Sequence, residues 1–180
     1  LQYWDLEDLY IKPFHAIIKP NRPEKAVKKA IEVIGDLWGL ANKEGLPAKL
    51  AWQSFMEWIE ETNGVGGVSG NPIISAYNIS FDAKFIKHHL VEYKLIKPGA
   101  FGYDWPWFLE FDAMAVAYLL FESDPTIHSL SFDTMLTRLG MKRENSAVHS
   151  AKEDVELLVD WIKRLMKFCR IARSKMRMKV

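Results

Sequence analysis

Three titratable residues lie where a fold could bring them into one site. Asp82 follows a short apolar stretch, 72–77, and comes just before a helical pattern. His149 and Asp154 flank the start of the last expected helix, which opens with the capping-box pattern Ser150-Ala-Lys-Glu153. The positive end of a helix holds a carboxylate ionised, and an imidazole beside it could titrate near neutral pH. Two acids and an imidazole suit cation binding and proton transfer.

Spacing alone leaves an ordinary structural role open for each of these residues. Asp82 and Asp154 could simply be acids that complement a helix start, and His149 could be a solvent-facing loop residue.

Apolar patterns predict the elements that would position these side chains. Strands are expected at 14–20, 72–77 and 108–111, and helices at 23–34, 48–61, 83–90, 113–121 and 129–139. Gly35 and Gly140 would end two of the helices. Asp112 looks like the N-cap of helix 113–121. The last helix carries an apolar stripe formed by Val155, Leu158, Ile162, Leu165 and Cys169. Helices mixed with strands indicate an α/β fold.

Composition limits the class of protein. The chain has 180 residues, of which 49% are hydrophobic and 26% charged, a balance that excludes a disordered or collagen-like chain. The single cysteine, Cys169, excludes a disulfide framework and favours a reducing compartment such as the cytoplasm. The longest apolar run, 113–121, is far too short for a membrane span.

The net charge of +1 hides an uneven distribution. Residues 163–180 hold eight of the 24 lysines and arginines and no acid, which leaves 16 basic against 23 acidic residues, or −7, in the rest of the chain. A basic tail could bind a polyanion, or it could complement the C-terminal end of a helix.

The motifs also resemble a known family. Ala76-Tyr-Asn-Ile-Ser-Phe-Asp82 resembles the Asn-x-x-Phe-Asp motif of the DnaQ-like (DEDDh) 3′–5′ exonucleases, of the ribonuclease T and DNA polymerase III proofreading-subunit type. His149-Ser-Ala-Lys-Glu-Asp154 resembles their His-x-Ala-x-x-Asp motif. Between the two motifs, segment 111–117 resembles the family's Asp-Thr/Ser helix start, and segment 128–140 resembles its Ser-Leu…Leu-Gly helix.

This resemblance implies an RNase-H-like mixed β-sheet flanked by α-helices. It places an exonuclease domain at 1–168 and a basic C-terminal tail at 169–180. Asp82 and Asp154 would be catalytic metal ligands for Mg²⁺ or Mn²⁺, and His149 the general base. Asn78 and Phe81 would contact the substrate, a single-stranded DNA or RNA 3′ end. A polymerase or another protein is a possible partner, and no membrane is involved.

The family's first motif, Asp-x-Glu on a first strand, has only one counterpart, Asp5-Leu-Glu7. It lies too close to strand 14–20 to leave room for the second strand that should intervene. We therefore expect the first strand upstream of Leu1, or else a module that has lost activity and binds nucleic acid or a protein partner.

Two aromatic features allow more than one interpretation. Phe81 could contact the terminal nucleotide or belong to the core. The segment Tyr103-Asp-Trp-Pro-Trp107 could stack on bases, pack on the core as a lid, or contact a partner. Because buried aromatic residues are common, we expect packing in both cases.

Overall fold

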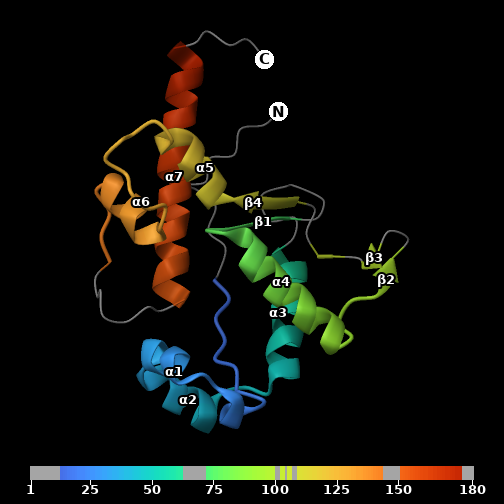
Figure 1. The fold of residues 1–180 in the computed structure, drawn as a ribbon. Helices are drawn as coiled ribbons and strands as arrows, with labels where there is room; N and C mark the ends of the chain where they lie inside the picture. Colours follow the sequence, from blue (N-terminus) through green and yellow to red (C-terminus); the bar gives the residue numbers. More distant parts are fainter. Residues whose placement is uncertain are drawn as a thin grey trace. The chain divides into compact units, whose positions relative to one another are not determined.

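The computed structural model describes residues 13–62, 72–99, 102–103, 105–106, 109–143 and 151–175. Helices and short strands alternate in this part of the chain, which confirms the mixed α/β class (Figure 1). The chain divides into two compact units, Leu1–Asp112 and Ala113–Val180.

The first unit contains both strand pairs. Its elements in chain order are η1 (Pro23–Lys25), α1 (Lys28–Ile34), α2 (Asp36–Glu44), α3 (Ala48–Thr62), β1 (Ile73–Ala76), α4 (Ile79–Glu92), β2 (Pro98–Gly99), β3 (Gly102–Tyr103) and β4 (Leu109–Asp112). The second unit is helical where it is described, with α5 (Ala113–Phe121), α6 (Phe132–Arg138) and α7 (Ala151–Lys175).

Strands β1 and β4 form a two-stranded parallel sheet. Ile73 pairs with Leu109, and Ala76 pairs with Asp112. Parallel neighbours need a long crossover, and α4 supplies it. The carboxyl ends of both strands therefore lie at the same edge of the sheet, which is where ligands bind in α/β folds. Strands β2 and β3 form a separate antiparallel pair.

Aromatic side chains join α3 to α4, which lie side by side in Figure 1. Trp52, on α3, is buried with Leu90 and Ile96. Its ring centroid lies 6.2 Å from that of Phe85 and 5.3 Å from that of His89, both on α4. Buried aromatics contribute large apolar areas, so these contacts fix α4 and with it the strand ends that α4 connects.

The predicted strand at 14–20 is not a strand. One parallel bridge joins Ile18 to Leu46, through hydrogen bonds from Lys19 N–H to the Leu46 carbonyl and from Leu46 N–H to the Ile17 carbonyl, both 2.8 Å. The segment is otherwise irregular. Its partner is the connection between α2 and α3, which offers only this single position for pairing.

Helix ends agree with the sequence prediction at some positions only. Gly35, with a φ of 58°, ends α1, and Gly140, with a φ of 67°, follows α6 as expected. Helix α4 begins at Ile79, so Asp82 lies inside its first turn. Helix α6 begins at Phe132, three residues later than predicted, because Ser131 is its N-cap and accepts a hydrogen bond from Thr134 N–H.

The buried side of α7 agrees with the middle of the predicted stripe but not with its two ends. Trp161 and Leu165 are buried, whereas Val155 is 58% exposed and Cys169 is also exposed. Leu158 and Ile162 are half-buried, so with Leu165 they confirm the middle of the stripe. The prediction missed Trp161, the largest buried side chain of the second unit.

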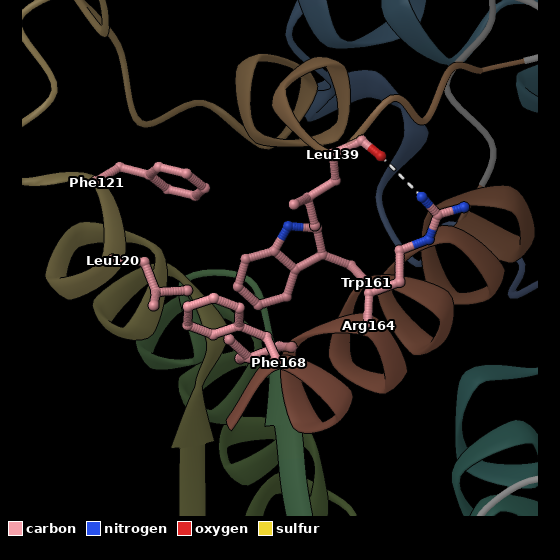
Figure 2. Close-up of a pocket in the computed structure, with 7 residues that line it drawn as sticks. Leu120, Phe121, Leu139, Trp161, Arg164 and Phe168 are labelled. Carbon is pink, nitrogen blue, oxygen red and sulfur yellow. Dashed lines mark hydrogen bonds between the residues drawn. The ribbon is translucent and has the colours of Figure 1, made fainter. Parts of the chain in front are cut away.

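A pocket of about 200 Å³ opens beside Trp161 in the second unit (Figure 2). Its walls are Leu120, Phe121, Leu139, Trp161, Arg164, Leu165 and Phe168, contributed by α5, α7 and the residue after α6. Arg164 Nη1 donates a hydrogen bond of 2.7 Å to the Leu139 carbonyl at the rim (Figure 2).

Helix α7 continues through Lys175, so the first residues of the predicted basic tail, 169–175, are helical. No described helix combines the length and the apolar character that crossing a bilayer requires.

Candidate active site

Asn78 connects the ends of the two parallel strands. It follows β1 and adopts the left-handed conformation, with φ 65° and ψ 55°, which asparagine tolerates better than most residues. This geometry directs its backbone N–H to Asp112 Oδ1, 3.0 Å away at the end of β4. The Asp112 carboxylate thus ties the turn after β1 to the neighbouring strand.

Hydrogen bonds also hold the side chain and the carbonyl group of Asn78 in place. Ser80 Oγ donates to Asn78 Oδ1 at 3.2 Å, and Phe81 N–H donates to the Asn78 carbonyl at 3.0 Å. These bonds fix the turn through which the chain enters α4, so the residues of the first helical turn have a defined position.

Asp82 lies in that first turn and is half-buried. Burial raises the pKa of its carboxyl group, and a hydrogen bond from its own backbone amide opposes the shift in part. A carboxylate that is kept from water in this way gains from a nearby cation, because the cation offsets the lost hydration.

Tyr77 adds a protonated hydroxyl to the same strand end. Burial, and secondarily the negative charge of Asp112, raises the pKa of Tyr77 to about 12. The phenol therefore keeps its proton at neutral pH. With Asn78, Asp82 and Asp112, the carboxyl ends of β1 and β4 carry oxygen donors of the type that Mg²⁺ and Mn²⁺ prefer.

Phe81 is not a core residue, so the packing interpretation is wrong for it. Its side chain is 70% exposed, next to Asp82 in the chain, and Phe85 one turn later is 53% exposed. For Trp105 the packing interpretation is confirmed: it is partly buried against the core, and Lys87 Nζ lies 5.0 Å from its ring centroid. Trp107 is outside the described residues.

Asp154 lies in the first turn of α7 and is paired with Arg143. Arg143 Nη1 donates to Asp154 Oδ1, and its Nε donates to Asp133 Oδ1 at 2.7 Å. The Arg143 side chain is only 9% exposed, and its guanidinium carbon lies 5.8 Å from the Phe132 ring centroid. Burial lowers the pKa of Arg143, but the hydrogen bonds and charges of Asp154 and Asp133 outweigh it and raise that pKa.

The predicted site residues are therefore distributed over the chain. Asp82, Asn78 and Phe81 share one turn of the first unit, and Asp154 belongs to the second unit. His149 lies outside the described residues, as do Asp5 and Glu7. The pairing of Asp82 with Asp154 and His149 stays a prediction.

Sequence reasoning missed two roles. It placed Asp112 as a helix cap, although an acid directly after an apolar strand is the same signal that singled out Asp82. It gave no role to Arg143, because nothing in the local pattern shows that this cation lies between the acids Asp133 and Asp154.

A search of family models, curated proteins and solved structures finds no match to this chain.

Proposed function

We propose that the chain is a 3′–5′ exonuclease domain of the DnaQ-like type, with an RNase-H-like sheet, that releases nucleoside monophosphates from single-stranded DNA or RNA ends. The observation that carries the proposal is the strand–turn–helix–strand unit in which Asn78 and Asp112 join the ends of β1 and β4 beside Asp82. By the resemblance, the Asn-x-x-Phe-Asp motif would follow a strand and open a helix, and residues 78–82 follow β1 and open α4.

The donor set fits a hard divalent cation. Asp82 and Asp154 would hold Mg²⁺ or Mn²⁺, which supply charge neutralisation at the scissile phosphate and a lowered pKa for the attacking water. The raised pKa of Asp82 supports this role, since a desolvated carboxylate is stabilised by a cation.

The remaining residues would act on the substrate and the proton. His149 would accept the proton of the attacking water, the general-base role for which imidazole is suited. Asn78, anchored by Ser80 and Asp112, would orient the terminal nucleotide by hydrogen bonding. Phe81, exposed beside Asp82, would stack on its base.

The test is mononucleotide release from a 3′-labelled single-stranded oligonucleotide by the full-length protein. Release is expected with Mg²⁺ or Mn²⁺ and is expected to stop with a chelator. The variant His149→Ala should lower the rate by about 10²–10⁴-fold. No release with either metal would refute the proposal.

A second candidate function is a non-catalytic module that grips nucleic acid or a protein partner. The ion pair between Arg143 and Asp154 favours it, because Asp154 already has a buried cation as its partner. This candidate predicts DNA binding that weakens steeply with salt, without any cleavage.

A further inference from the structure

The last turns of α4 carry a cluster that the exonuclease proposal does not use. His88, His89 and Glu92 each offer one ligand atom, and these three atoms lie within 4.8 Å of one another. His89 Nδ1 is 3.1 Å from Glu92 Oε2, and His88 Nε2 is 3.7 Å from the same oxygen. Glu92 is three residues after one histidine and four after the other, so all three lie on one face of the helix.

His89 is held in place by surrounding rings. Its ring stacks on those of Trp52, with the centroids 5.3 Å apart and the planes at 23°, and Tyr93, at 5.9 Å and 10°. The ring of Phe85 meets it edge to face, with the centroids 4.6 Å apart. Asn21 Nδ2 donates to the Tyr93 hydroxyl at 2.7 Å and anchors one wall. The His89 side chain is only 19% exposed, whereas that of His88 is 70% exposed and can turn.

We propose that His88, His89 and Glu92 form a binding site for a divalent transition-metal ion, with Zn²⁺ as the best match. Two imidazole nitrogens and a carboxylate oxygen are typical zinc ligands, and Mg²⁺ does not favour such a nitrogen-rich set. Ligand atoms about 2.0–2.1 Å from a tetrahedral zinc lie about 3.3 Å apart. The distances from Glu92 Oε2 to His89 Nδ1, 3.1 Å, and to His88 Nε2, 3.7 Å, bracket that value. Rotation of the exposed His88 side chain would bring its nitrogen to a similar distance from the His89 nitrogen.

The position of the cluster also favours a cation. It lies at the C-terminal end of α4, where Tyr93 follows the last helical residue and the helix dipole is negative. Three protein ligands leave one tetrahedral position for water. The ligand residue nearest to Asp82 in the chain, His88, is six residues, or about 9 Å along the helix axis, away from it. The nitrogen-rich cluster would select a different metal from a site that has only oxygen ligands.

Titration of the full-length protein with Zn²⁺ by calorimetry, in an excess of Mg²⁺ that saturates oxygen-only sites, tests this proposal. His88→Ala and Glu92→Gln should each weaken Zn²⁺ binding at least tenfold and remove the zinc-dependent rise in melting midpoint. The control His128→Ala removes an exposed histidine elsewhere and should bind like wild type.

NMR of the imidazole nitrogens provides an independent readout. Zn²⁺ should shift the resonances of both His88 and His89. Equal zinc affinity in wild type and His88→Ala, or unshifted His88 and His89 resonances, would overturn the proposal. His88→Ala is expected to leave Mg²⁺-dependent nuclease activity unchanged, so failure of the zinc site and failure of the exonuclease assignment are distinguishable.

Discussion

Asp82 is half-buried in the first turn of α4, and burial raises the pKa of its carboxyl group, which at the scale of single residues is a feature typical of functional groups. Its turn is fixed by Asn78, whose left-handed conformation and bond to Asp112 leave the carboxyl group half-buried. At the same strand end, the negative charge of Asp112 contributes to the raised pKa of Tyr77. Such an arrangement is expected where a carboxylate serves binding or catalysis rather than stability.

We expect Asp82→Asn to increase the free energy of unfolding at pH 7. Because burial raises the folded pKa of Asp82, the unfolded chain ionises first as pH rises. The stability contribution of the protonated carboxyl group is present below its ordinary pKa of 3.8 and is lost as pH rises through the folded value. The amide side chain of the Asp82→Asn variant does not ionise, so this variant does not lose stability as pH rises. Urea unfolding at pH 7 measures the effect, and a less stable variant would contradict the assigned burial.

Arg143 is the other residue on which the site depends. Arg143→Gln should lower the free energy of unfolding by about 1–2 kcal/mol, since charged hydrogen bonds to partly exposed carboxylates contribute modestly. The same change should lower the Mn²⁺ concentration needed for half-maximal nuclease activity, because Asp154 loses its competing cation.

Arg138→Gln is the control for this change. It removes a guanidinium whose ion pair with Asp124 is longer, at 3.9 Å, and which lies away from Asp154. If both variants required the same Mn²⁺ concentration, Arg143 would have no role in the acidic site.

At the scale of elements, the strand–helix–strand unit was predictable because each piece carries its own signal. An apolar run, an asparagine and an acid define β1 and the start of α4, and the apolar helix 113–121 was correct at both ends. The prediction of a strand at 14–20 was wrong, because pairing depends on tertiary structure and among the described residues this segment pairs only with Leu46. The stripe of α7 was correct at Leu158, Ile162 and Leu165 and wrong at its two ends, Val155 and Cys169, where burial depends on what packs against the helix.

Gly45 tests the connection that holds segment 14–20. A Cβ at this position would lie 2.3 Å from the Ala41 carbonyl oxygen and 2.7 Å from Lys19 N. Gly45→Ala is therefore expected to lower the free energy of unfolding by about 1–3 kcal/mol, the usual cost of overpacking.

Gly39→Ala is the matched control, because it lies within α2 and a Cβ there meets no atom within 4 Å. Alanine should raise stability at this position by about 0.5–1 kcal/mol. Similar denaturation midpoints for the two variants would show that the close approach of Gly45 to Lys19 is absent in solution.

At the scale of the whole molecule, the charged residues and the predicted site residues are distributed unevenly along the chain. The body, residues 1–162, is acidic, and the eight basic residues begin within α7 and continue beyond it. Asp82 belongs to one unit and Asp154 to the other. The prediction that Asp82 and Asp154 act together comes from the order of their two motifs along the chain.

The central claim is that Asp154 serves metal-dependent hydrolysis rather than only the ion pair with Arg143. Asp154→Asn and Asp133→Asn each remove one carboxylate from the same guanidinium, which makes them a matched pair. The most direct measurement is Mg²⁺-dependent mononucleotide release by the full-length protein and these two variants. The account predicts that Asp154→Asn abolishes release, with a melting midpoint near that of wild type, while Asp133→Asn retains it. Unchanged release by Asp154→Asn would contradict the account.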